Sequence, residues 1–323
     1  MVNNHYLAFS GGTPQSNYRA SFGVMDHNTI IKKMDYNVFV AKVDVTQKAF
    51  NDRLTGEFGV FGSSFKNHDI FDTQMLFYSA ACQNPTFPAG TDEHGNWLKN
   101  ESATHVNPPG ILLEEKNDSK DLNFDAHIKL SYDFNKNWRV STFGSYLYGS
   151  TENGQFCPTW VWAQGNVYRG EFKKEEWLGN VSLDFNKEFG IHKVSAGVSS
   201  EYRKLRKTAF WVYAKGIPTN DFHYDNLGAT AARPYGGTES TYEDQSLASV
   251  MGSITYNLLD RYTLAVNARG DGSSMVGDNN TWGFFPSVSF TWDMKKESFL
   301  ANIKPLSMLK LRTGLGQAGN LGG

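Results

Sequence analysis

Apolar and polar residues alternate strictly along several stretches of the chain. In residues 123–132, NFDAHIKLSY, one face carries Phe, Ala, Ile, Leu and Tyr, and the other carries Asn, Asp, His, Lys and Ser. The same alternation returns in residues 177–186, 193–202, 250–256, 262–271 and 284–292, and more weakly in 36–45. A period of two residues is typical of a β-strand with one apolar face. The pattern predicts about twelve strands of roughly ten residues, the length that crosses a bilayer at a tilt.

Short and long connections take turns between these strands. The short ones are residues 12–16, 49–53, 134–137, 186–191 and 257–261, and the long polar ones are roughly 65–121, 149–175 and 205–245. One tight rim and one rim with large loops are typical of outer-membrane barrels. We therefore predict an antiparallel up-and-down transmembrane β-barrel, with long extracellular loops and short periplasmic turns.

The residues on both faces of the predicted strands support a membrane barrel. Aromatic residues gather near the short turns, in the pairs Tyr132 and Trp138, Phe185 and Phe189, and Tyr256 and Tyr262. Such rings suit the lipid headgroup layer. A charge that faced lipid, such as Lys129, would cost about 2–4 kcal/mol near the midplane. The polar face must therefore line a lumen or contact a plug. A soluble β-sandwich, whose strands also alternate, is the alternative fold.

Composition and charge exclude several classes of protein. The 323 residues include 31 basic and 33 acidic ones, so the positive excess that binds nucleic acid is missing. No run approaches the roughly 18 apolar residues of a membrane helix. The start, MVNNHYLAFSGG, lacks the features of a signal peptide, and we expect it to lie inside a longer protein. Cys82 and Cys157 are either unpaired thiols or one bridge between surface loops.

The sequence contains no convergent catalytic constellation. The eight His residues are scattered, and HExxH, GxSxG and Walker motifs are missing. The sequential carboxylate pairs Glu114–Glu115 and Glu175–Glu176 are best interpreted as solvated charges. We therefore predict that the protein is not an enzyme, and we assign no metal or cofactor.

One segment closely resembles the barrel signature of the SusC/RagA family of TonB-dependent receptors. The stretch RYTLAVNARGDGSSMVGDNNTWGFFPSVSFTWDM covers residues 261–294. The matching residues are Arg269, Asp271, Gly272, Ser273, Ser274, Asn279, Asn280, Trp282, Gly283, Phe285, Pro286 and Ser287. Residues 7–33, 83–97 followed by 107–115, and 309–320 resemble further parts of the family's barrel. The sequence departs from the family pattern at Met275, Val276 and Thr281, which puts the charge of that loop in doubt.

This resemblance implies a plugged outer-membrane barrel that imports oligosaccharides or peptides. Its partners would be the TonB complex, which supplies the energy, and a surface lipoprotein similar to SusD, which acts as a lid. The known plugged transporters have 22 strands, so about twelve strands would be a partial barrel. We expect residues 1–323 to be a barrel segment that lacks the plug domain, the TonB box, the signal peptide and the remaining strands.

The matched motif residues have two interpretations, a structural role and contact with a ligand, and the structural one is favoured. Pro286 lies inside a predicted strand, where it removes a ladder donor, so we expect a bulge or kink there. Four loop tryptophans, Trp97, Trp160, Trp162 and Trp211, are candidates to line a sugar path. They would serve equally as stacking platforms of a soluble carbohydrate-binding or adhesion β-domain, which is the alternative function. A passive porin-type channel is a third possibility.

Overall fold

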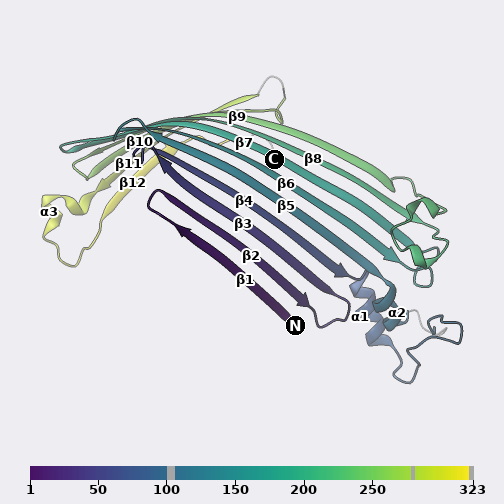
Figure 1. Cartoon of the computed structure of the whole chain (residues 1–323). Coiled ribbons are helices and arrows are strands. Elements are labelled where there is room, and N and C mark those ends of the chain that lie inside the picture. Colours follow the sequence, from purple (N-terminus) through teal and green to yellow (C-terminus); the bar gives the residue numbers. More distant parts are fainter. Residues whose placement is uncertain (100–105, 278–280, 320–323) are drawn as a thin grey trace.

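The computed structural model describes residues 1–99, 106–277 and 281–319 of the chain. Its main element is one antiparallel sheet in which each strand pairs with the next along the sequence, from β1 to β12. Figure 1 shows this sheet as a long curved surface, with α1 and α2 at one end of the strands and α3 at the other. Within the described ranges β1 and β12 do not pair with each other, so the sheet is open. The prediction of twelve strands in up-and-down order is confirmed.

The strands are longer than the sequence suggested. They are β1 Val2–Gly12, β2 Ser16–Asn28, β3 Asp35–Ala49, β4 Leu54–Asp69, β5 Lys116–Asp133, β6 Trp138–Cys157, β7 Asn166–Phe189, β8 His192–Lys215, β9 Thr238–Leu258, β10 Tyr262–Ser273, β11 Trp282–Asp293 and β12 Lys310–Gly316. β7 and β8 each have 24 residues. The predicted length of roughly ten residues is therefore wrong for these strands.

The three predicted long loops are shorter than expected, because the strands continue into them. The connections that remain are residues 70–115, 158–165 and 216–237. In β7, residues 169–176 read RGEFKKEE and carry charges on both faces, yet they stay paired with β8. A strand with two polar faces keeps its hydrogen-bonded ladder but loses the alternation by which it is recognised in a sequence.

The short connections lie where the sequence predicted them, and one further connection joins β11 to β12. β7 and β8 are joined by Gly190 and Ile191, and Gly190 has a φ of 58°, which a glycine adopts without strain. The connection between β11 and β12 is longer and holds the short helices η3 Met294–Lys296 and α3 Ser298–Ala301. Figure 1 places α3 at the same end as the short turns. We call this end the turn end and the opposite end the loop end.

The pairing register sorts the side chains into two faces. Leu183 pairs with Val198, and Val198 pairs with Gly252, so these residues lie on one face. Asp184 and Asn267 lie on the other face, together with further polar residues. Val198 is 50% exposed although it is apolar. A large exposed apolar face is unfavourable in water and is expected in contact with lipid. We therefore call the apolar side the lipid face and the polar side the inner face.

Aromatic rings form a belt on the lipid face near the turn end. The ring centroids of Trp138 and Phe185 are 4.7 Å apart, and those of Tyr262 and Trp292 are 6.2 Å apart. His192 Nδ1 lies 2.6 Å from the hydroxyl of Tyr256. This arrangement confirms the aromatic clusters predicted at the short turns. A second aromatic group, Phe124, Tyr146 and Trp177, lies further along the same face.

Beyond the second aromatic group, the lipid face becomes charged. The turn-end belt itself contains Lys187. Beyond it, the first charged side chains on β4 to β9 form a row that we call the charged belt: Lys66, Lys120, Glu152, Glu175, Lys204 and Asp244. On β8, about ten residues separate Val194 from Lys204, which is about 33 Å of strand. At a tilt near 45° this spans about 23 Å, close to the apolar band of outer-membrane barrels. The loop-end halves of the long strands therefore project out of the membrane.

Two helices pack between the loops at the loop end. They are α1 Thr73–Cys82, capped by the side chain of Asp72, and α2 Pro108–Glu114, capped by Asn107. Ile70 and Ile111 are buried there in a small apolar core, against which residues of the two neighbouring loops pack. None of the helices in the described ranges has the length and hydrophobicity to cross a bilayer.

Candidate functional site

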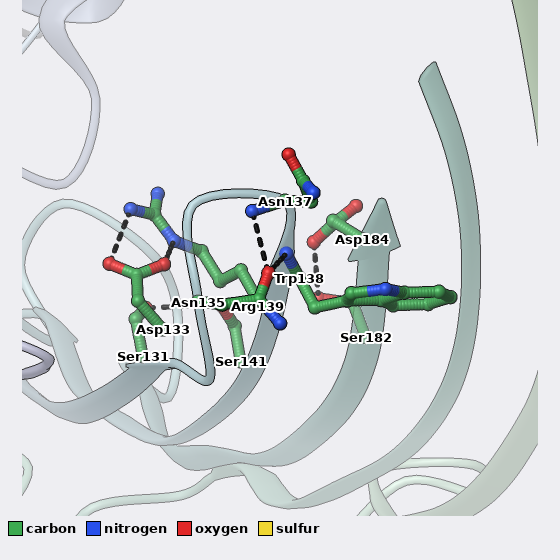
Figure 2. A network of polar contacts seen from close by, with 9 residues as sticks. All are labelled: Ser131, Asp133, Asn135, Asn137, Trp138, Arg139, Ser141, Ser182 and Asp184. Carbon is green, nitrogen blue, oxygen red and sulfur yellow. Dashed lines mark hydrogen bonds and ion pairs between the residues drawn. The ribbon is translucent and has the colours of Figure 1, made fainter. Parts of the chain in front are cut away.

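The inner face at the turn end carries a network of paired polar groups. Arg139 Nε lies 2.7 Å from Asp133 Oδ1, and Nη2 lies 3.0 Å from Oδ2. Figure 2 shows this two-point ion pair beside the turn, with Trp138 pointing away from it. The Asn135 side chain accepts hydrogen bonds from the backbone N–H groups of Asn137 and Trp138, at 2.8 and 3.2 Å. The turn is thus held by its own residues, and Arg139 neutralises the carboxylate beside it.

Ion pairs continue along the inner face towards the loop end. Arg203 Nε lies 2.7 Å from Glu176 Oε1, and Lys129 Nζ lies 3.4 Å from Glu57 Oε1. Charges of both signs on a half-exposed surface favour contact with water or with another polar protein surface over contact with lipid. The inner face is therefore suited to line an aqueous path or to pack against a polar plug.

A groove of 660 Å³ runs over the inner face of β7 to β11. Its lining combines Asp184, Ser253, Asn267 and Arg269 with the ring of Phe285. Hydroxyl, amide and charged groups beside one aromatic ring can hydrogen-bond a polar solute and contact an apolar part of it. The groove includes four residues of the sequence motif, Arg269, Asp271, Phe285 and Ser287.

Arg269 and Asp271, both in the motif, form an ion pair with each other on β10. Arg269 Nε lies 2.7 Å from both carboxylate oxygens of Asp271, and Nη2 donates to Ser249 Oγ at 3.0 Å. Asp271 is only 7% exposed, so its charge depends on this pair. The contacts tie the end of β10 to β9. Ser273, at the end of β10, is also buried and accepts from the backbone N–H of Met275 at 3.1 Å.

The other motif residues shape the hairpin of β10 and β11. A Cβ atom on Gly272 would lie 2.7 Å from the ring of Trp282, so only glycine lets this ring lie across the strand. Gly283 pairs with Asp271 in the ladder. Asn279 and Asn280 lie outside the described residues. The placement of the described motif residues favours the structural role and leaves ligand contact by the groove residues as a prediction.

The bulge predicted at Pro286 is absent from the register. Pro286 pairs with Ala268, and the residues on both sides pair without an inserted residue. The Pro286 carbonyl accepts from the N–H of Gln317 at 3.0 Å, so its nitrogen faces the β12 side. The β12 ladder ends at Gly316, next to Gln317. The backbone N–H that proline lacks would therefore point to the place where the β12 ladder ends, and the strand needs no bulge to accommodate Pro286.

Two of the four candidate tryptophans pack against each other at the loop end. The indole N–H groups of Trp97 and Trp160 donate to the two carboxylate oxygens of Glu114, at 2.5 and 2.7 Å. A Cβ on Gly110 would lie 2.5 Å from the Trp160 ring. These contacts fasten the connection of residues 70–115 to that of residues 158–165. Trp162 lies in the second connection and is 44% exposed.

Trp211 belongs to a different surface. It lies on the inner face of β8, where its ring stacks on Phe172 of β7 at 6.2 Å between centroids and an interplanar angle of 14°. Phe172 is exposed. The structure therefore separates the four tryptophans into a loop cluster, formed by Trp97 and Trp160 with Trp162 nearby, and an inner-face platform formed by Trp211 with Phe172.

Sequence reasoning missed three carboxylates that organise the ends of the sheet. Glu114 joins two indoles, and Glu297 accepts hydrogen bonds from Tyr262, Arg261 and Trp292. Glu115 is 4% exposed and accepts from the backbone N–H of Asp72 at 3.0 Å. The interpretation of Glu114 and Glu115 as solvated charges is therefore wrong. In the sequence both lie inside the predicted loop of residues 65–121, and nothing there signals that this loop packs around them.

The two cysteines are free thiols. Cys82 is exposed at the end of α1, whereas Cys157 is buried and lies 3.5 Å from Glu115 Oε1. Of the two possibilities left open by the sequence, the unpaired thiols are correct. No group of three or more His, Cys, Asp and Glu side chains suited to a metal ion occurs in the part of the chain that the structure describes.

Comparison with known proteins supports the membrane assignment. Residues 50–321 match the family model described as "TonB dependent receptor-like, beta-barrel". The receptor P3 of Formosa agariphila is 28% identical over 337 residues, which cover 99% of this chain and 33% of that protein. The receptor SusC of Bacteroides thetaiotaomicron is 27% identical over 353 residues, which cover 98% and 33%. The chain thus spans about a third of the length of these relatives.

Solved structures show the same fold. The RagAB peptide transporter superposes with a TM-score of 0.77 at 15% identity, over 98% of this chain and 36% of that one. The ferric citrate transporter FecA superposes with a TM-score of 0.56, over 91% and 40%. The relatives are receptors and not enzymes, and their place in the outer membrane excludes the soluble β-domain. The open twelve-stranded sheet is a partial barrel, and the chain belongs to the β-barrel family of TonB-dependent receptors.

Proposed function

We propose that this chain forms the substrate-lining wall of an importer that takes up oligosaccharides with energy from TonB. The observation that carries the proposal is the platform of Trp211 and Phe172 on the inner face at the loop end. Sugar rings present apolar C–H faces that stack on exposed aromatic rings, and their hydroxyls need polar neighbours. Thr151 and Asp121 lie on the same face, with 2.5 Å between their side-chain oxygens.

The relatives support uptake that depends on TonB, and the name of one solved structure gives the main alternative substrate. SusC is a TonB-dependent receptor, whereas RagAB is a peptide transporter. A peptide substrate is therefore the second candidate. We further propose that a surface lipoprotein similar to SusD covers the loop end, and that a plug domain and a TonB box act together with this barrel wall. The loop end would then face the cell exterior.

Replacing Trp211 by Ala tests the platform. We expect the variant to weaken oligosaccharide binding roughly tenfold, because truncation of a central aromatic anchor removes more than 1 kcal/mol of binding energy. The measurement is uptake of a labelled oligosaccharide by cells that carry the protein. Phe210→Ala is the matched control, since Phe210 is adjacent in β8, is exposed and points to the opposite face.

The two variants separate the substrate classes. Oligosaccharide uptake that falls in Trp211→Ala and stays unchanged in Phe210→Ala supports the proposal. Equal uptake by both variants and the wild type would show that the Trp211 and Phe172 platform does not contact the substrate. Uptake of a labelled peptide but not of the oligosaccharide by the wild type would replace the sugar by a peptide as the substrate.

A further inference from the structure

Two lysines face each other on the lipid face where the charged belt begins. Lys66 of β4 and Lys120 of β5 are direct partners in the antiparallel register. Leu122 and Phe124 point to the same face two and four residues closer to the turn end. Like charges opposite each other in a sheet are destabilising, because their side chains lie only about 5 Å apart at Cβ. A folded protein that keeps such a pair gains from a negative group placed between them.

These two amines have no carboxylate partner in the described structure. No ion pair within 4.0 Å involves either lysine in the described ranges, although Glu152 faces Lys120 across the ladder. The nearby carboxylates are engaged elsewhere. Asp118 lies 3.0 Å from His68 and accepts from the Tyr224 hydroxyl at 2.5 Å. Asp225 lies 3.3 Å from Arg169.

A pocket of 270 Å³ on the outside of the sheet is lined by this lysine pair. One wall of the pocket is formed by Tyr224 and Asp225 of the connection of residues 216–237, which folds back over the lipid-face side of the strands. Tyr224 of this connection packs so closely on β6 that a Cβ on Gly154 would lie 2.5 Å from its ring. Phe156, Val167 and Ala214 are buried beneath the same connection. Protein rather than lipid covers this part of the lipid face. The pocket therefore lies just outside the hydrocarbon layer, on its loop-end side.

We propose that this pocket binds the phosphorylated sugar headgroup of a glycolipid in the outer leaflet. The phosphate would lie between Lys66 and Lys120, and sugar hydroxyls would donate to the Glu152 carboxylate, which also lines the pocket. The position favours a lipid headgroup, because the pocket continues the apolar band that holds the acyl chains. The inference rests on the loop end facing the cell exterior. It does not depend on which solute the inner face transports.

Native mass spectrometry of the protein purified in detergent from its own membrane tests the site. The probe is lipid A, a phosphorylated glucosamine disaccharide lipid, added in increasing amounts. We expect the double variant Lys66→Gln, Lys120→Gln to bind lipid A roughly 30-fold more weakly, since each lysine contributes on the order of 1 kcal/mol to contact with anionic headgroups. Lys129→Gln, on the inner face beside Glu57, is the control and should bind like the wild type.

Further measurements distinguish this proposal from misfolding and from simple phosphate binding. Without lipid, the double variant should be at least as stable to heat as the wild type, because a like-charge contact is removed. Dephosphorylated lipid A should bind weakly to all variants, and inorganic phosphate should not displace lipid A. Equal binding of phosphorylated and dephosphorylated lipid, displacement by inorganic phosphate, or an equal loss in Lys129→Gln would each overturn the proposal.

Discussion

Val198→Arg is expected to prevent most of the protein from assembling in a bilayer. Val198 lies on the lipid face of β8, six residues from His192 in the turn-end belt and six from Lys204 in the charged belt. An arginine at this height would lie near the midplane of the hydrocarbon, where it costs about 2–4 kcal/mol. Folding into lipid vesicles, followed by urea titration, measures this loss.

Two matched substitutions show whether the face and the depth are assigned correctly. Ser199→Arg places the same side chain one residue further along β8, where it points into the groove of the inner face, so folding should be nearly unchanged. Leu264→Arg also faces lipid but lies only two residues from Tyr262 in the turn-end belt. Its cost should therefore fall towards about 0–1 kcal/mol. An equal defect in Val198→Arg and Ser199→Arg would contradict a one-sided lipid face.

The helices at the loop end should loosen as the pH rises from about 5 to 8. Burial raises the pKa of Glu115 to about 7, and the neighbouring Asp72 carboxylate acts in the same direction. The hydrogen bonds from Asp72 N–H and Cys157 oppose this shift without cancelling it. Burial also raises the pKa of the Cys157 thiol well above its ordinary value, so this group stays neutral. Neither Asp72 nor Cys157 supplies a positive charge to the buried carboxylate.

The sign of the effect follows from the protonation of Glu115 in the folded and unfolded states. The unfolded carboxyl group loses its proton near pH 4.5 and the folded one near pH 7. Between these values the folded state binds more protons, so its stability falls as the pH rises, and it levels off above about pH 7. The full shift corresponds to roughly 3 kcal/mol. Opening of the α1–α2 region should therefore be more frequent at pH 8 than at pH 5.

Glu115→Gln should abolish this pH dependence. The amide oxygen still accepts from the Asp72 N–H, and the side chain carries no charge to bury. Hydrogen exchange of residues 73–82 measures the opening, compared at pH 5 and pH 8 after correction for the intrinsic exchange rate. Glu93→Gln, a highly exposed carboxylate in the same connection, should leave the wild-type dependence intact. A wild-type protein with equal protection at both pH values would contradict the assigned burial of Glu115.

The alternation of side chains made the barrel predictable, because lipid on one side and polar groups on the other impose a period of two. All the strand segments identified by this pattern lie in strands of the described sheet, and Val198 and Asp184 lie on the faces expected for them. The strand ends could not be located in the same way. Beyond Lys204 and Glu175, towards the loop end, charged residues occur on both faces of the strands, so the strict alternation that marks a strand in a sequence is lost.

The contacts between loops were not predictable from spacing. Glu114 receives hydrogen bonds from tryptophans 17 and 46 residues away. Glu115 contacts Asp72, which caps α1, and Cys157 of β6, and no local pattern connects these residues to it. The motif around Arg269 was recognised by resemblance, yet its ion pair with Asp271 and its hydrogen bond to Ser249 became visible only in the structure of β9 and β10. Placing Trp211 on the inner face required the full pairing of β7 with β8.

The orientation of the barrel is the central claim, and labelling of intact cells with a membrane-impermeant maleimide tests it most directly. Cys82 is exposed at the end of α1 and is a natural probe of the loop end, whereas Cys157 is buried. Asn135→Cys in a Cys82→Ser background probes the turn between β5 and β6. We expect Cys82 to react in intact cells and residue 135 only after the cells are broken. Reaction of residue 135 in intact cells, with Cys82 unreactive, would contradict the account.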